Sequence, residues 1–193
     1  IGLESRIGGA VHLAVFKQIG PVLAGAMIGG RVGGAIAAEI GSMRANDQVD
    51  ALRVMGINPI AHLVVPRVVA CVLMLPVLTI VADLIGMVGG YVVTVWAFNV
   101  NANDYWFYSA QAITNWDLLG GIAKSVLFGG AIGLISCYKG FHCAPVAREV
   151  GRATTEAFVS SFLTIIVINL VMAHFLNELY AYVYDAPRPS VFG

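Results

Sequence analysis

Ionisable side chains within apolar stretches are the first candidates for chemistry in this sequence. Asp83 lies near the middle of an apolar stretch that runs from about residue 68 to 98. A carboxyl group at that depth of a membrane is costly and often functional, so a proton- or ion-coupled transport site is one interpretation. The other is a structural carboxyl, protonated and hydrogen-bonded to a neighbouring helix.

Arg31 raises the same question in an earlier apolar stretch, from about residue 19 to 38. It could join Asp83 in an ion-coupled site. Its structural interpretation is a guanidinium that reaches the membrane interface or pairs with Glu39 or Glu156. The same stretch contains overlapping G-x-x-x-G pairs, which are typical of helices that pack closely in lipid.

The sequence carries no recognisable catalytic constellation. Its four histidines are scattered without an H-E-x-x-H motif, and no Ser-His-Asp or paired-carboxylate arrangement emerges. The segment "CYKGFHC" brings Cys137, His142 and Cys143 together, so a metal site is conceivable, but inert thiols in a reducing compartment are the simpler interpretation. A G-x-x-x-x-G-K-[ST] loop is also lacking. We therefore expect neither an intramembrane enzyme nor ATP chemistry within this chain.

The composition indicates a membrane protein. Of 193 residues, 59% are hydrophobic and 11% are charged, whereas soluble domains carry about 25% charged residues. The net charge of zero gives no sign of nucleic-acid binding. We predict an all-α polytopic membrane protein, one transmembrane domain over residues 1–193. Since a span needs about 20 apolar residues, the predicted spans cover about residues 19–38, 68–98, 122–138 and 157–179.

Some details within this layout are also predictable. The second span is longer than a bilayer requires, so it is tilted, kinked near Pro76 or continued into the interface. The polar, aromatic segment from about 99 to 117 is expected to lie at the outer interface. We expect Lys124 to reach the interface from its span, and Thr154 to cap the start of the last helix.

Basic residues predict the orientation of the chain. They occur in the first and third connections but not in the second: Arg44, Arg53 and Arg67, then Lys139, Arg148 and Arg152. By the positive-inside rule, the first and third connections are cytoplasmic. Residue 1 would then lie on the outer side, so we expect an earlier span in a longer protein.

The most polar part of the first connection is "EIGSMRANDQVDALRVMGINP", residues 39–59. It predicts a short amphipathic helix over about 46–55, with Asn46 or Asp47 as its cap and Gly56 as its left-handed end. Such a helix can lie on lipid or dock into a groove of a partner protein. Its acidic residues disfavour an anionic lipid surface, so a protein partner is the sharper hypothesis.

Four long segments carry a resemblance to a known family. They are "IGPVLAGAMIGGRVGGAIAAEIGSMRANDQVDALRVMGINP", "PRVVACVLMLPVLTIVADLIGMVGGY", "KSVLFGGAIGLISCYKG" and "VGRATTEAFVSS". From about residue 16 to 174, the chain resembles the MlaE-type (YrbE-type) permeases, the membrane subunits of Mce-linked ABC transporters that move lipids across the bacterial envelope. The pattern A-E-[IL]-G-x-M-x-x-x-[DE]-Q-[ILV]-[DE]-A-L is long and specific.

The resemblance implies that residues 46–55 form a coupling helix that docks in a groove of a separate ABC ATPase. ATP and Mg²⁺ would bind that partner, and this chain would need no cofactor. A proton-coupled transporter then becomes the alternative hypothesis. The residues that match the family motif and are expected to make the contact are Glu39, Arg44, Asp47, Gln48, Asp50, Ala51, Leu52 and Met55.

The resemblance also implies a homodimer in the bacterial inner membrane, with a phospholipid cavity between its two copies. The cavity would open toward a periplasmic Mce-domain protein, a small accessory subunit would attend the ATPase, and the system would serve outer-membrane lipid asymmetry. An interfacial helix and a span would precede the part seen here. Many members carry a basic-Glu pair facing the cavity where this chain has Lys17 and Gln18, so a negative charge there is in doubt, although Lys17 could still meet a phosphate.

Overall fold

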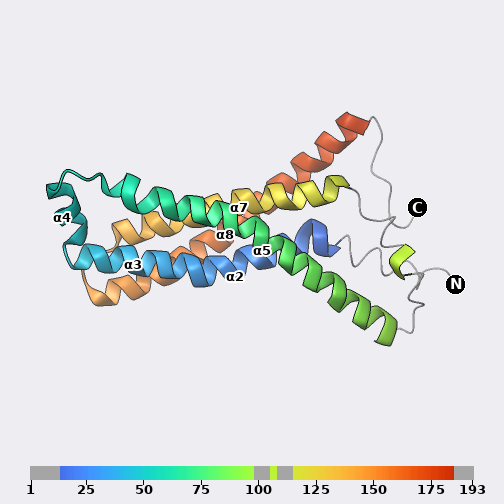
Figure 1. Cartoon of the computed structure of the whole chain (residues 1–193), viewed down its shortest axis with the longest axis horizontal. Coiled ribbons are helices and arrows are strands. Elements are labelled where there is room, and N and C mark those ends of the chain that lie inside the picture. Colours follow the sequence, from blue (N-terminus) through green and yellow to red (C-terminus); the bar gives the residue numbers. More distant parts are fainter. Residues whose placement is uncertain (1–13, 98–104, 108–114, 185–193) are drawn as a thin grey trace.

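The computed structural model describes residues 14–97, 105–107 and 115–184, and every regular element in these ranges is a helix (Figure 1). Four segments are long and apolar enough to cross a membrane: Lys17–Ala45, Ile60–Trp96, Trp116–His142 and Arg148–Tyr180. These findings confirm the prediction of an all-α polytopic membrane protein with four spans. Each helix begins before the predicted span, because the flanking polar residues continue it beyond the apolar window.

The first span alternates α-helical turns with wider π-helical turns. It comprises η1 Val15–Ile19, α2 Gly20–Ile28, η2 Gly29–Gly33 and α3 Gly34–Ala45. Such π-turns are rare and are often found at functional sites. Arg31 lies within η2, so this candidate cation projects from an irregular turn in the middle of a span.

The second span follows α4 Gln48–Val54, a short helix at one end of the bundle (Figure 1). It consists of η3 Ile60–Val64, α5 Val65–Val92 and η4 Val93–Ala97, and α5 continues through Pro76 without ending. The 37 residues of this span correspond to about 55 Å of helix. It therefore exceeds a hydrocarbon core of about 30 Å, as its sequence length predicted.

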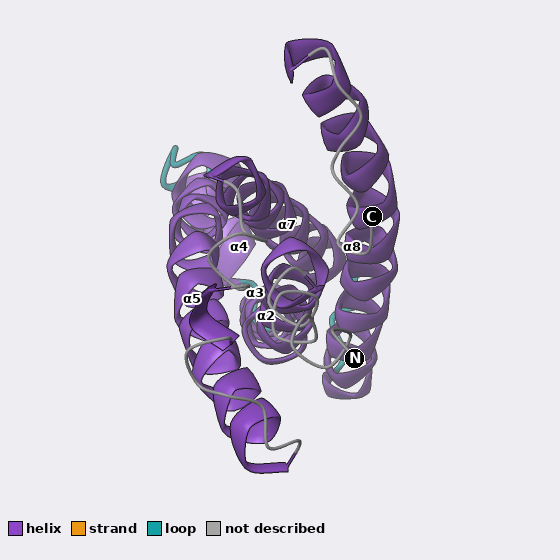
Figure 2. Ribbon diagram, turned by 90° about the vertical axis from the view of Figure 1, so that its right-hand side faces the viewer, coloured by secondary structure: helices purple, strands orange, loops and turns teal. Residues whose placement is uncertain are grey.

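The last two spans are α7 Asn115–His142 and α8 Ala147–Tyr184, joined by a short turn. Figure 2 shows α5 and α8 on opposite sides of a centre formed by α2, α3 and α7. Two buried clusters hold this centre together. One contains Leu75, Phe128, Ile132 and Ile165, and the other contains Ile36, Ile40, Cys71 and Cys137.

Glycines of α7 allow the closest approach between helices. A Cβ atom on Gly129 would lie 2.6 Å from the carbonyl oxygen of Cys71 in α5, and one on Gly140 would lie 2.9 Å from that of Ala37 in α3. Membrane helices have little hydrophobic force between them, so such small faces gain stability from close van der Waals contact. The two positions allow α7 to approach the backbones of α5 and α3 closely.

Part of the predicted outer interfacial segment is visible as a helical turn over residues 105–107. The buried Tyr105 hydroxyl donates a hydrogen bond of 3.2 Å to the carbonyl of Met87 in α5. Burial raises the pKa of the Tyr105 phenol, which therefore stays neutral and able to donate. Of the rest of this segment, residues 115–117 begin α7, and residues 99–104 and 108–114 lie outside the described residues.

The predicted cap at the last helix was wrong. α8 begins at Ala147, and the Thr154 hydroxyl lies within the helix, where it donates a 2.9 Å hydrogen bond to the carbonyl of Val150. The polar residues before the apolar window have enough helix propensity to continue α8 by two turns.

Candidate functional site

α4 is bounded on both sides by residues in left-handed conformation. Asp47 precedes it with φ 56° and Gly56 follows it with φ 76°. At its end, the Gly56 amide donates to the Arg53 carbonyl and the Ile57 amide donates to the Leu52 carbonyl, both at 3.0 Å. This is a Schellman motif, in which a left-handed glycine ends the helix. The predicted role of Gly56 is confirmed.

The predicted side-chain cap at the start of α4 was wrong. Neither the Asn46 nor the Asp47 side chain accepts a hydrogen bond from the first amides of α4. Instead, the side-chain amide of Asn46 donates a 3.0 Å hydrogen bond to the Ser42 carbonyl in α3. The left-handed turn at Asp47 directs the side chains away from the first amides of α4. Asn46 therefore terminates α3 rather than starting α4.

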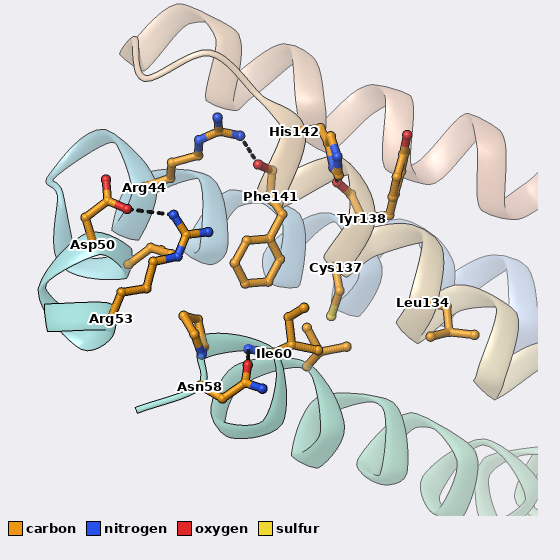
Figure 3. Close-up of a pocket in the computed structure, with 13 residues that line it drawn as sticks. Arg44, Asp50, Arg53, Asn58, Ile60, Leu134, Cys137, Tyr138, Phe141 and His142 are labelled. Atoms are coloured by element: carbon orange, nitrogen blue, oxygen red, sulfur yellow. Dashed lines mark hydrogen bonds and ion pairs between the residues drawn. The ribbon is translucent and has the colours of Figure 1, made fainter. Parts of the chain in front are cut away.

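Contacts to three spans hold α4 and its flanks in place. Glu39 of α3 forms a 2.9 Å ion pair with Arg67 of α5. The Arg44 guanidinium, at the end of α3, donates a hydrogen bond to the carbonyl of Phe141 in α7 (Figure 3). The side chain of Val49, a residue of α4, is buried. The short helix thus lies in a connection whose flanking helices are bonded to each other, α3 to α5 and α3 to α7.

α4 presents two different faces. Val49, Asp50 and Arg53 lie three and four residues apart and share the side that faces η3 and α7. Asp50 and Arg53 form an ion pair of 2.9 Å there. Four further residues of α4 and its C-cap are exposed and do not border the space between α4, η3 and α7: Gln48, Ala51, Val54 and Met55.

Most of the residues expected to contact the ATPase are accessible from outside. Leu52 is half-buried, and the other seven are exposed: Glu39, Arg44, Asp47, Gln48, Asp50, Ala51 and Met55. Glu39 and Arg44 also link α3 to α5 and α7 through the contacts just described. The sequence analysis missed Val54, which is 89% exposed, and Ile57, which is 40% exposed. With Met55, these two residues form an exposed apolar surface around Gly56, which we call the apolar tip. The sequence could have indicated it, because apolar residues lie on both sides of the glycine that ends the helix.

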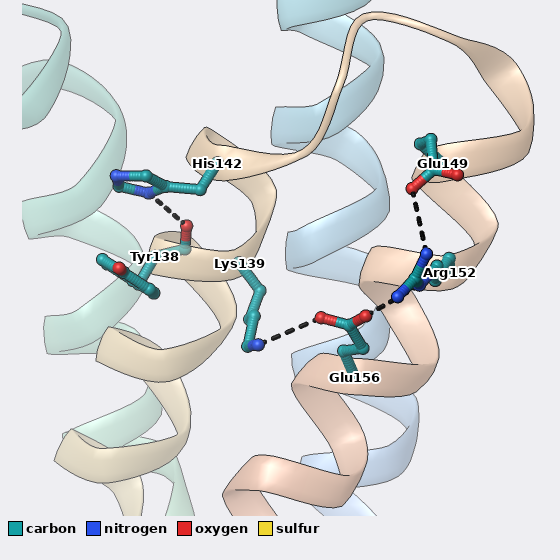
Figure 4. Close-up of polar contacts among 6 residues, drawn as sticks. All are labelled: Tyr138, Lys139, His142, Glu149, Arg152 and Glu156. Carbon is teal, nitrogen blue, oxygen red and sulfur yellow. Dashed lines mark hydrogen bonds and ion pairs between the residues drawn. The ribbon is translucent and has the colours of Figure 1, made fainter.

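The turn between α7 and α8 lies at the same end of the bundle as α4 (Figure 1). Glu156 accepts hydrogen bonds from Lys139 at 3.0 Å and from Arg152 at 2.9 Å (Figure 4). Arg152 also lies 3.9 Å from Glu149. The basic residues of the first and third connections thus gather at one end of the bundle, as the predicted orientation requires.

The expected partners of Arg31 were wrong. Glu39 pairs with Arg67, and Glu156 pairs with Lys139 and Arg152. Within the described residues, Arg31 forms no ion pair and its side chain is exposed on the bundle. Both carboxylates therefore have basic partners other than Arg31.

Asp83 is buried where α5 crosses α2. Its Oδ1 atom packs against Gly20 so closely that no Cβ would fit there. This oxygen has no hydrogen-bond partner among the described residues, so the expected bond to a neighbouring helix is not made through it. The structure does not pair Asp83 with Arg31.

The expectation that Lys124 reaches the interface was also wrong. Its side chain is only 1% exposed. The ammonium donates hydrogen bonds to the Lys17 carbonyl at 3.0 Å and to the Gln18 side-chain oxygen at 3.3 Å. A buried ammonium needs acceptors, and the turn at η1 supplies them. Lys17 and Gln18, expected at a lipid cavity, are half-buried beside this lysine, and Lys17 also lines a small cavity with Trp116.

The cysteines lie within the helical core. Cys71 and Cys137 belong to one buried cluster, and Cys143 is buried against Gly41. The ring of His142 stacks on that of Tyr138, with the ring centroids 4.2 Å apart. In the part of the chain that the structure describes, no three His, Cys, Asp or Glu side chains are placed to hold a metal ion.

Comparison with known proteins shows similarity to a family of membrane permeases. The family model "Permease MlaE" matches residues 1–175. A probable ABC transporter permease protein of Rickettsia typhi is 40% identical over 91% of this chain and 68% of its own length. The intermembrane phospholipid transport system permease protein MlaE of Haemophilus influenzae is 31% identical over 88% of this chain and 65% of its own length.

A plant protein is similar as well. The chloroplast protein TRIGALACTOSYLDIACYLGLYCEROL 1 of Arabidopsis thaliana is 35% identical over 92% of this chain and 51% of its own length. The chain thus spans about two thirds of the length of its bacterial relatives and half that of the plant one.

Proposed function

The chain belongs to the MlaE permease family, and on this premise we propose that it is the transmembrane subunit of an ABC transporter for phospholipid or a related hydrophobic substrate. The transporter moves this substrate between the bacterial inner membrane and a periplasmic Mce-domain protein. The phospholipid transport named for the Haemophilus relative supports this substrate class. Two copies of the chain enclose the lipid path, and a separate ATPase with its accessory subunit supplies the energy.

One observation carries the coupling part of the proposal. The helices around α4 are tied together, since Glu39–Arg67 links α3 to α5 and Arg44–Phe141 links α3 to α7, while the outer residues of α4 and the apolar tip at Val54 are exposed. A push on α4 would reach α3 and the second span, which it connects, and the bonds of α3 to α5 and α7 would pass the movement on to those helices. Apolar side chains at the tip of α4, ringed by charged ones, suit a groove on a protein partner.

The exposed residues of α4 support an ATPase contact at this end of the bundle. ATP and Mg²⁺ bind on that partner, since the present sequence has no phosphate-binding loop. The basic residues at the same end make it the cytoplasmic side, where ATP is available.

A second candidate function rests on the buried carboxyl group of Asp83, whose Oδ1 atom has no hydrogen-bond partner in the part of the chain that the structure describes. A buried carboxyl group in a span is a plausible proton site, and a proton-coupled transporter would use it. ATP coupling remains the proposal that accounts for α4, which a proton-coupled transporter would not need.

The test is to purify the full-length protein from native membranes in mild detergent and to identify by mass spectrometry the proteins and lipids that accompany it. We expect a stoichiometric P-loop ATPase, an Mce-domain protein and bound phospholipid. Recovery of the protein without an ATPase would contradict the proposal and favour the gradient-driven alternative.

A further inference from the structure

One side of α4, which carries Val49, Asp50 and Arg53, borders a groove, and the proposed function gives no role to the apolar wall of this groove. The groove has a volume of about 760 Å³ and lies between α4, the start of the second span and the last turns of α7. That volume is within the range of about 300–1,000 Å³ that is usual for small-molecule sites. A helix whose outer face serves a partner protein thus has a second face directed at an open space.

The groove is charged at one end and apolar at the other. Figure 3 shows Arg44, Asp50 and Arg53 at the α4 end and Leu134 at the far end, with Phe141 and Cys137 between them. From Phe141 to Leu134 the apolar wall runs about 10 Å along α7. The arrangement matches an amphiphile with its polar head at α4 and a hydrocarbon chain running along the spans.

The charges at the α4 end favour an anionic head. Two arginines and one aspartate give this end a net charge of +1, and Asp50 is already paired with Arg53. Each guanidinium has five N–H donors, and the bonds of Arg53 to Asp50 and of Arg44 to the Phe141 carbonyl leave others for a phosphate. A zwitterionic head would bring a cation that finds no free carboxylate among the residues lining the groove.

The apolar end is open to the membrane. Leu134 is 57% exposed and Ile60 is 62% exposed, and both belong to helices long enough to cross a bilayer. A chain lying between them would stay in contact with surrounding lipid. The groove can therefore be filled directly from the leaflet at the α4 end.

We propose that this groove binds one anionic phospholipid of that leaflet, with its phosphate at Arg53 and Arg44 and one acyl chain along Ile60, Cys137 and Leu134. The lipid would sit behind α4 and support it against the spans. This site is separate from the lipid path proposed between two copies of the chain, and its occupancy requires neither the ATPase nor transport.

Photo-crosslinking tests the proposal on the full-length protein in nanodiscs of phosphatidylcholine. One preparation contains phosphatidylglycerol with a diazirine on one acyl chain, and the other contains phosphatidylcholine with the same diazirine. Mass spectrometry of the peptides locates the adducts. We expect the phosphatidylglycerol probe to label residues 60–64 and 134–141, and the phosphatidylcholine probe to label them much less.

Matched variants identify the head and chain positions. Arg53→Glu should lower labelling in the groove by about tenfold, the loss expected for a charge-assisted hydrogen bond to phosphate. Arg148→Glu, a charge reversal at another exposed arginine of the same end, should leave it unchanged. Leu134→Trp should block labelling sterically, whereas Leu163→Trp on the exposed face of α8 should not.

Three results would overturn the proposal. They are equal labelling of the groove by both probes, unchanged labelling in Arg53→Glu, and absence of labelling there in the native protein. The last result would mean that a protein segment covers the groove, such as a part of the chain before residue 14 or a second copy of the chain. None of them would bear on co-purification of the ATPase, so failure of this inference is distinguishable from failure of the proposed function.

Discussion

Glu39 at the end of the first span and Arg67 at the start of the second form an ion pair of 2.9 Å that bridges the two helices on either side of α4. The Arg67 side chain is 19% exposed and that of Glu39 is 61% exposed. Because water screens the carboxylate, the pair adds little to global stability. Its effect is geometric, since it closes the loop that carries α4.

Breaking this pair should impair coupling more than folding. For Arg67→Met we expect a loss of stability of about 1 kcal/mol or less, together with a clear decrease in ATP-driven lipid transfer. Thermal unfolding in detergent and transfer by the reconstituted transporter measure the two effects. The charge-exchanged double variant Glu39→Arg/Arg67→Glu should recover part of the transfer, and equal losses in stability and transfer would argue against a geometric role.

The apolar tip of α4 is expected to be the centre of the ATPase contact. Val54→Arg places a charge where an apolar groove of the partner would lie, so it should reduce retained ATPase by about tenfold or more, as for a central interface residue. Quantitative co-purification measures this effect. The control is Val146→Arg, the same change at an exposed valine in the turn before α8, and equal losses in both variants would contradict a specific role of α4.

The double variant Asp50→Arg/Leu52→Arg probes the docking role expected from the sequence. Because both residues lie on α4, outside the spans, we expect it to uncouple the ATPase while the protein still folds. Asp50 borders the groove face, so the effect of this variant should be weaker than that of Val54→Arg. Normal ATPase recovery would count against the docking role of these two positions.

Asp83→Asn distinguishes ATP-driven from proton-coupled transport. If Asp83 is a structural carboxyl group, an isosteric amide should leave ATP-driven lipid transfer intact, whether or not a proton gradient is present. The measurement is lipid transfer in proteoliposomes with and without an uncoupler. Loss of transfer in a folded Asp83→Asn protein, together with sensitivity to the uncoupler, would support the proton-coupled alternative.

The close approach of α7 to α5 predicts a contrast between two glycines. Gly129→Ala would place a Cβ 2.6 Å from the Cys71 carbonyl oxygen, so it should lower the free energy of unfolding by about 1–3 kcal/mol. Gly89→Ala, in α5, meets no atom within 4 Å and should be neutral or slightly stabilising, since alanine favours helix more than glycine does. Similar melting temperatures for the two variants would contradict this packing.

Some of this architecture follows from local sequence alone. The number of spans follows from the length of the apolar stretches, and the end of α4 follows from Gly56, whose missing Cβ permits the left-handed turn. The gathering of basic residues at one end also agrees with their placement along the chain. These features depend on the local cost of burying charge or bending the backbone, which a few neighbouring residues decide.

Other features were decided only by tertiary structure. A span that is apolar on nearly all sides gives no sign of which residues face a neighbouring helix. The sequence analysis therefore placed Lys124 at the interface, and one of its two alternatives for Arg31 was a pairing with carboxylates that have other partners. The rotation of each helix depends on packing against others: Gly20 accepts Asp83, and η1 supplies acceptors for Lys124. The groove behind α4 unites residues from Arg44 to His142, and no local pattern predicts a surface built from such distant segments.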